Sequence, residues 1–329
     1  MFLGTSGSVP TANRAPTSLL VRREGERFLV DCGEGTQRQL LRSGVGLVEL
    51  REVFITHFHA DHYLGLPGML KTFALRGREA SLTVYGPPGL AQLVDGLRRI
   101  FGRLTFRLEL QELQPGEALD RDGYQIIPFS VRHAVAGLGY ALVESPRPGR
   151  FDVVAARALG VPEGPLWGRL QQGEPVSLPD DTRIAPEQVL GPPRPGRKVV
   201  LSGDTSPARS VLEAAIEADL LVHEATFSAE ESERAEETGH STAADAAELA
   251  RVAGVRMLAL THLSNRYFGP EILREARSIF PDTVVPRDFD IIDVRFAERG
   301  GPVLVKGGAL GRAGEGVIDE VAVVHGEGQ

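Results

Sequence analysis

Three histidines and one aspartate lie within the short segment FITHFHADHYLGLPG, between His57 and His62. The whole chain of 329 residues has only 8 histidines, so this concentration is local. The apolar residues before it predict a β-strand, and a loop leaving a strand end can turn several side chains toward one point. Imidazole nitrogens and carboxylate oxygens are good zinc ligands. The segment therefore predicts a metal site that uses His57, His59, Asp61 and His62.

Further candidate ligands follow three other apolar segments. His133 follows FSVR, Asp204 follows VVLSG and His262 follows LALT. Taken singly, His133 also fits a capped strand end, Asp204 a turn, and His262 an ordinary structural histidine. Together they repeat the pattern of the first cluster, an apolar strand that delivers a ligand at its end, so we include them in the site.

Short strands alternating with helices predict a layered α/β fold. A hairpin is predicted around Glu24 and Gly25, and the apolar spacing predicts helices in EGTQRQLLRSG, GLAQLVDGLRRIFG, HSTAADAAELARVAGV and GPEILREARSIFPD. The polar candidates lie at the carboxyl ends of predicted strands, where sites cluster in α/β folds.

Residues 146–195 differ from the rest in being rich in proline and glycine, which predicts an insertion outside the main core. From Pro146 to Lys198 the chain has eight Lys or Arg against six Asp or Glu, whereas the whole chain carries a net charge of −8. The overall acidity argues weakly against nucleic-acid binding, but carboxylates that hold metal count as negative in this sum.

Composition also bears on where the protein works. No apolar run is long enough to predict a membrane span, and the N-terminal segment MFLGTSGSVPT lacks the features of a signal peptide. The single cysteine, Cys32, cannot form an internal disulfide, and its apolar neighbours predict a buried thiol. We therefore expect a cytoplasmic protein that does not enter a membrane.

The motifs THFHADH, SGDT and LTHLS together resemble the metallo-β-lactamase superfamily. Within it, FLGTSGSVPT, VDCGEGTQRQL, VHEATF, HSTAADAA and LTHLSNRY resemble ribonuclease Z, the tRNA 3′-processing endonuclease. The resemblance covers about residues 1–290 and implies a four-layer αβ/βα sandwich. It also implies a flexible tRNA-binding arm at 146–195, and it leaves 291–329 as a C-terminal extension that we expect to be partly disordered.

The resemblance implies a ligand set for two zinc ions. His57, His59 and His133 would hold one ion, Asp61, His62 and His262 the other, and Asp204 would bridge them. The donor types would also suit manganese.

Catalytic roles are implied for three residues. His240 would give a proton to the leaving oxygen, Glu224 would orient His240, and Asp61 would also accept a proton from the attacking water. The implied reaction removes the 3′ trailer from precursor tRNA by cutting after the discriminator nucleotide, leaving a 3′-hydroxyl. Family members are typically homodimers, so we expect one here.

Substrate contacts are expected mainly in the arm, where GVPEGPLWG resembles the family's Gly-Pro motif. The expected arm residues are Arg147, Arg150, Arg157, Arg169, Gly164 and Pro165. Arg266 is a candidate phosphate contact because a guanidinium matches phosphate oxygens. Arg14, in PTANRA, matches one position of a basic loop found in bacterial members, but Ala12 and Ala15 do not. How the protein treats precursors with an encoded CCA therefore stays open.

Two other functions fit the same residues. One is a small-molecule phosphodiesterase or arylsulfatase-like hydrolase of the superfamily, which would have no need of the arm. The other is a tRNA-binding protein with an inactive site, against which the complete ligand set argues.

Overall fold

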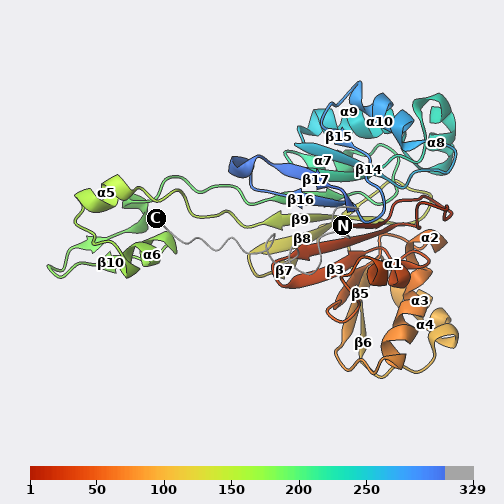
Figure 1. Ribbon diagram of the computed structural model, residues 1–329, viewed down its shortest axis with the longest axis horizontal. Coiled ribbons are helices and arrows are strands. Elements are labelled where there is room, and N and C mark those ends of the chain that lie inside the picture. Colours follow the sequence, from red (N-terminus) through yellow and green to blue (C-terminus); the bar gives the residue numbers. More distant parts are fainter. Residues whose placement is uncertain (308–329) are drawn as a thin grey trace.

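The computed structural model describes residues 1–307 and consists of two β-sheets that face each other, with helices on their outer faces and an arm that projects from one side (Figure 1). The fold class predicted from the sequence, layered α/β, is confirmed. Among the described residues, no helix has the length and apolar character needed to cross a membrane.

The first sheet has six strands in the order β1 to β6, and β3 to β6 run parallel. The predicted hairpin at Glu24 and Gly25 joins β2 and β3. The strands are β1 Phe2–Gly4, β2 Ser18–Arg23, β3 Glu26–Val30, β4 Glu52–Phe54, β5 Leu82–Gly86 and β6 Leu108–Glu112.

The second sheet has seven strands in the order β15-β14-β13-β12-β9-β8-β7, and β12 to β15 run parallel. Because the carboxyl ends of parallel strands share one edge, the loops that follow β12, β13 and β14 begin beside one another. The strands are β7 Leu119–Arg121, β8 Tyr124–Ser130, β9 Leu138–Glu144, β12 Lys198–Leu201, β13 Leu220–Glu224, β14 Met257–Thr261 and β15 Thr283–Val284.

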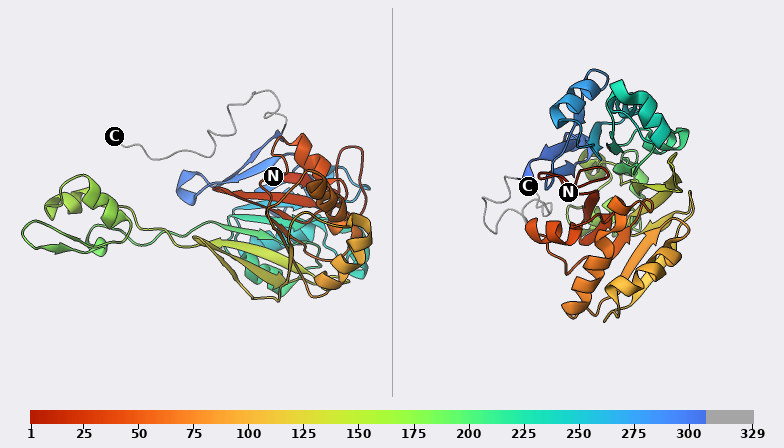
Figure 2. Two further views of the ribbon diagram at one scale, coloured as in Figure 1. Left: turned by 90° about the horizontal axis from the view of Figure 1, so that it is seen from below. Right: turned by 90° about the vertical axis from the view of Figure 1, so that its right-hand side faces the viewer.

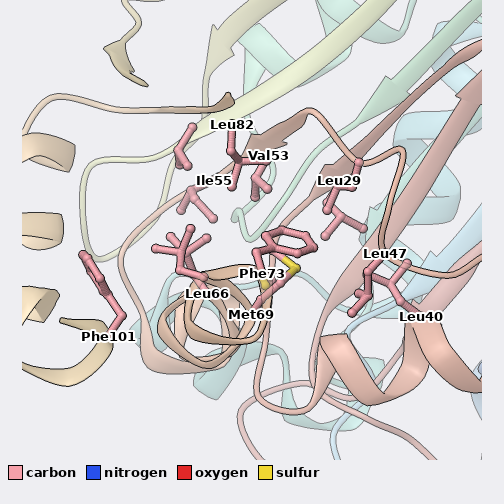
Figure 3. Close-up of a cluster of buried hydrophobic side chains, with 14 of the residues drawn as sticks. Leu29, Leu40, Leu47, Val53, Ile55, Leu66, Met69, Phe73, Leu82 and Phe101 are labelled. Atoms are coloured by element: carbon pink, nitrogen blue, oxygen red, sulfur yellow. The ribbon is translucent and has the colours of Figure 1, made fainter. Parts of the chain in front are cut away.

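Three hydrophobic cores hold the four layers together. One packs the first sheet against helices α1 Thr36–Arg42, α3 Gly65–Leu75 and α4 Leu90–Phe101, with Leu66, Met69 and Phe73 pointing into it (Figure 3). The second packs the other sheet against α7 Arg209–Ala215, α9 Ala243–Ala253 and α10 Gly269–Arg277. The third fills the space between the sheets and includes Phe54 and Tyr140. The layers therefore follow the order helix, sheet, sheet, helix.

The insertion forms an arm with a small core of its own. Two chain segments lead from the body to the arm, which stands clear of both sheets (Figure 2). Its elements are α5 Val153–Ala158, α6 Pro165–Gln171, the paired strands β10 Val176–Ser177 and β11 Arg183–Ile184, and a short 3-10 helix, Pro186–Gln188. Ala156, Val161, Leu170 and Val189 are among its buried residues.

Several predicted elements are confirmed, and others were not predicted. The helices predicted in EGTQRQLLRSG, GLAQLVDGLRRIFG, HSTAADAAELARVAGV and GPEILREARSIFPD correspond to α1, α4, α9 and α10, which are shorter than the predicted segments. The sequence did not predict α3, in which Gly65, Pro67 and Gly68 interrupt the usual helix signals. β16 Ile291–Val294 and β17 Pro302–Val305 form a separate hairpin. Most of the C-terminal segment expected to be disordered, 308–329, lies outside the described residues.

Candidate metal centre

The structure brings all seven predicted ligands together at one edge of the two sheets. His57, His59, Asp61 and His62 occupy the loop after β4 and the short helix α2 Ala60–Tyr63. His133 comes from the connection between β8 and β9, Asp204 follows β12, and His262 follows β14. The site therefore lies where parallel strands of both sheets end.

Two groups of ligand atoms are compact enough to hold metal. His57, His59, His133 and Asp204 form one, and Asp61, His62 and His262 form the other. Within each group every ligand atom lies within 4.8 Å of the rest. These sets match the pairing that the family resemblance implies.

Asp204 lies between the two groups. Its Oδ2 atom is 3.7 Å from Nε2 of His57, 3.3 Å from Nε2 of His62 and 3.2 Å from Nε2 of His262. Asp61 is next to it, with Oδ2 at 3.2 Å from Nε2 of His262. A carboxylate in this position can serve both groups, which fits a bridging ligand.

The surrounding protein fixes the orientation of four imidazoles. The Nδ1 atom of each contacts an oxygen: Thr56 Oγ1 for His57 at 3.0 Å, Asp31 Oδ2 for His62 at 2.8 Å, the Gly239 carbonyl for His133 at 2.7 Å and Thr226 Oγ1 for His262 at 2.8 Å. The Nε2 atoms are thereby left for the centre of the site. Metal-binding histidines are commonly held in this way by a partner on the other ring nitrogen.

The residues present fit a metal ion. Nε2 of His57 is buried and has no hydrogen-bond partner within residues 1–307. A buried polar atom without a partner lowers the stability of the fold unless a bound ligand contacts it. Burial, followed by the neighbouring His62, lowers the pKa of His57 to about 2, so its ring is neutral and able to coordinate. Asp31, Asp61 and Asp204 add negative charge that attracts a cation.

The two ligand carboxylates are held ionised. Burial alone would raise the pKa of Asp204, but the neighbouring His262 and His62 outweigh it and hold that pKa well below its usual range. Burial would also raise the pKa of Asp61. The hydrogen bond from His262 and the charges of His62 and His262 outweigh burial, so the pKa of Asp61 falls below its usual value. Both side chains are therefore in the form that binds metal.

His240 and Glu224 form a pair beside the ligands. Nδ1 of His240 lies 2.9 Å from Oε1 of Glu224 and 3.9 Å from Oδ2 of Asp204. Burial lowers the pKa of His240, but the hydrogen bond and charge of Glu224, with the charge of Asp204, outweigh it and raise the pKa to about 9. Glu224 is buried at the end of β13 and also accepts a hydrogen bond from the Thr205 amide at 2.7 Å. His240, Asp204 and His262 also form a third compact group.

The candidate substrate arginines of the body have protein partners. Arg14 is half-buried and donates to Thr5 Oγ1 at 2.6 Å and to the Pro286 carbonyl at 2.9 Å. Arg266 lies 2.8 Å from Glu231. Substrate binding by Arg14 and Arg266 stays a prediction. The hydrogen bonds of Arg14 connect its loop to Thr5 and Pro286, which is a structural role.

The arm arginines fall into two kinds. Arg157 and Arg169 are exposed and pair within the arm with Glu163 and Glu174. Arg147 instead lies where the arm joins the body and pairs with Glu298. Arg150 is in the same connection, and Gly164 and Pro165 begin α6. RNA contacts by all six residues stay predictions.

Sequence reasoning missed residues that hold the ligands. Asp31 follows the apolar strand β3 just as Asp204 follows β12, so the same signal could have found it. Ser8 had no such signal, since it acts through its backbone: its amide donates to Asp61 Oδ2 at 2.7 Å. Asp31 and His262 have φ angles of 61° and 56°, a conformation that most residues avoid and that is often found at functional sites.

Two sheets with outer helices and a His/Asp cluster at their shared edge define a protein of the metallo-β-lactamase fold, with a cluster compatible with metal binding. Human tRNase Z, short form, has a similar structure, with a TM-score of 0.64 and 26% identity over 88% of this chain and 96% of that one. Sequence relatives make the assignment narrower: the chain belongs to the ribonuclease Z family.

The relatives that carry this assignment cover nearly the whole chain. It is 45% identical to ribonuclease Z of Methanosarcina acetivorans, over 90% of this chain and 97% of the relative. It is 51% identical to ribonuclease Z of Myxococcus xanthus, over 81% of this chain and 87% of the relative. A family model described as anti-Pycsar protein Apyc1 matches residues 1–135. That match ends before the arm and before Asp204, Glu224, His240 and His262.

Proposed function

We propose that the protein is a metal-dependent endoribonuclease that removes the 3′ trailer from precursor tRNA. It would cut after the discriminator nucleotide and leave a 3′-hydroxyl on the tRNA. The observation that carries this proposal is the joint presence of two compact ligand groups, the His240–Glu224 pair and the projecting arm in one chain of the ribonuclease Z family.

The proposed cofactor is two zinc ions, with manganese as the alternative. His57, His59 and His133 would hold one ion, Asp61, His62 and His262 the other, and Asp204 would contact both. When bound, two such ions would lower the pKa of water and offset the charge that develops on the phosphate.

His240 is the proposed proton donor to the 3′ oxygen of the tRNA. With Nδ1 bonded to Glu224, its proton for transfer would be carried on Nε2. A raised pKa keeps His240 protonated at neutral pH, which suits an acid. Glu224 is itself fixed by Thr205 and Thr226, so it can hold the ring in one orientation.

Asp61 is the proposed acceptor of the proton from the attacking water. One of its oxygens is held by the Ser8 amide and lies beside His262. Its lowered pKa keeps the carboxylate ionised, which is the form that can accept a proton.

The arm is the proposed tRNA-binding module, with residues 1–290 as the catalytic domain and 146–195 inserted in it. Arg157 and Arg169 are exposed and pair with nearby glutamates. Because exposed ion pairs contribute little, these arginines can exchange a carboxylate for an RNA phosphate at small cost. A homodimer working in the cytoplasm is part of the same proposal.

The test uses end-labelled precursor tRNAs with 3′ trailers, one with an encoded CCA and one without. Each is incubated with zinc-loaded protein and, as a control, with the His240→Ala variant. We expect one cut after the discriminator nucleotide, lost in the variant. Hydrolysis of bis(p-nitrophenyl) phosphate with no RNA cleavage would favour the small-phosphodiesterase function. RNA binding without hydrolysis of either substrate would favour an inactive tRNA-binding protein.

A further inference from the structure

The hairpin formed by β16 and β17 meets the base of the arm. Two segments connect the arm to the body, residues 145–150 leaving β9 and residues 190–197 returning to β12; together we call them the stalk. The hairpin extends from the body toward the arm in Figure 1. Its turn contains Phe296 and Glu298, and both contact the stalk.

The backbone of the stalk is poorly suited to fixing the direction of the arm. One isolated bridge joins its segments, Arg147 to Arg194, and a second, Phe151 to Leu190, lies just beyond its outer end. Proline has no amide hydrogen and cannot donate to a ladder. The stalk carries prolines at positions 146, 148, 192, 193 and 195. Side-chain contacts must therefore supply much of what orients it.

Glu298 joins both segments of the stalk. Arg147, on the outgoing segment, places its Nη1 and Nη2 atoms 2.9 Å and 3.2 Å from the two carboxylate oxygens. Arg194, on the returning segment, places Nη1 3.0 Å from Oε1. Arg147 is only 22% exposed and Glu298 only 27%, so solvent screens this contact less than it screens the arm's own ion pairs.

Phe296 adds a second contact with the same segments. The Arg147 guanidinium lies 3.5 Å from the centre of its ring, and the Arg197 guanidinium lies 4.5 Å from it. Arg197 also donates to the Val294 carbonyl at 3.1 Å and binds Glu144 at the end of β9. Cation–π contacts of this kind favour one placement of the ring relative to the two cations.

The hairpin is itself anchored to the body. The Phe2 amide donates to the Asp290 carbonyl at 2.9 Å, and Lys306 lies 2.9 Å from the Asp290 carboxylate. Ile292 and Val294 pack against the core between the sheets. Contacts at its turn are therefore made from a fixed base.

We propose that the hairpin is a brace that sets the direction of the arm, with Glu298 and Phe296 as positioning residues for the tRNA substrate. The arm's direction does not depend on the proposed function, whereas the consequence for tRNA rests on it. Arg147 then helps to orient the arm by contacting the hairpin, in addition to any contact that it makes with RNA.

The direction is measured as a distance between spin labels at Val154→Cys in the arm and Val252→Cys on α9. Both positions are exposed, and Cys32, the only native cysteine, is buried. Labelled protein is diluted with unlabelled protein so that pairs within one chain dominate. We expect a narrow distribution that broadens in Glu298→Gln and in Phe296→Leu. It should stay narrow in Phe296→Tyr, which keeps the ring, and in the control Glu213→Gln, which breaks an exposed pair with Arg209 on α7.

Kinetics test the consequence for substrate. In the two brace variants we expect KM for precursor tRNA to rise about fivefold to tenfold with kcat little changed, since the chemistry is untouched. Hydrolysis of bis(p-nitrophenyl) phosphate should not change. An unchanged distance distribution in both variants would overturn the brace, and a broadened distribution with unchanged KM would overturn its role toward tRNA. If the unaltered protein fails to cut precursor tRNA, the proposed function fails, while the distances still decide the brace.

Discussion

Nδ1 of His240 lies 2.9 Å from Oε1 of Glu224, although the two residues come from different elements, the approach to α9 and the end of β13. The carboxylate is buried and holds the ring in one orientation beside Asp204. A histidine held in this way can act as an acid or as a further metal ligand, and the two roles predict different results.

Replacing His240 by Ala should lower kcat on precursor tRNA by about 10²–10⁴-fold, since general acid catalysis supplies a factor of that size. Glu224→Gln should have a smaller effect in the same direction. KM should stay near its original value. The amount of bound metal, measured by mass spectrometry, should also be unchanged. Loss of metal from His240→Ala would instead identify His240 as a ligand.

Removing metal should destabilise the protein. A ligand that binds only the folded state stabilises it by mass action, and here it would also satisfy the buried Nε2 of His57. We expect chelator treatment to lower Tm by roughly 5–10 °C, with zinc restoring it. Asp204→Asn should bind less metal and show a smaller chelator effect. An unchanged Tm on chelation would contradict a resident metal.

Glu144 should make stability depend on pH. Burial would raise its pKa, but hydrogen bonds from Arg197, the charge of Arg197 and a hydrogen bond from Arg23 lower it from 4.5 to about 2. A lowered pKa contributes stability that is present above pH 4.5 and is lost as the pH falls toward 2. Glu144→Gln should cost roughly 1–3 kcal/mol of unfolding free energy at pH 7.

Urea unfolding across this range tests the prediction. The difference between the unaltered protein and Glu144→Gln should shrink below pH 4.5, where the carboxylate begins to bind a proton in the unfolded state. A difference that stays constant down to pH 2 would assign the effect to packing or to the shape of the side chain.

The exposed arm arginines should act on tRNA affinity alone. The double variant Arg157→Ala with Arg169→Ala should raise KM for precursor tRNA and flatten its dependence on salt, since phosphate contacts release counterions. kcat and Tm should be nearly unchanged, because exposed pairs contribute little to stability. Arg209→Ala is the matched control, since Arg209 has a similar exposed pair on α7. If the double variant and Arg209→Ala changed KM and its salt dependence equally, contact between the arm and RNA would be contradicted.

Local patterns in the sequence determined several features of this protein. Apolar strands that end in His or Asp predicted the ligands, the turn at Glu24 and Gly25 predicted a hairpin, and the proline-rich insertion predicted a segment outside the core. Each of these signals lies within a few neighbouring residues, so it can be recognised without knowledge of the fold. The order of the motifs also indicated the ribonuclease Z family, and the sequence relatives confirmed it.

Only the tertiary structure decided how distant segments meet. It placed Asp204 between the two ligand groups, set Asp31 and the Ser8 amide against His62 and Asp61, and turned Arg147 toward Glu298. The helix α3 is likewise stabilised by its buried face, although glycine and proline weaken its local signals. Contacts between residues far apart in sequence depend on sheet order and packing, which no local pattern encodes.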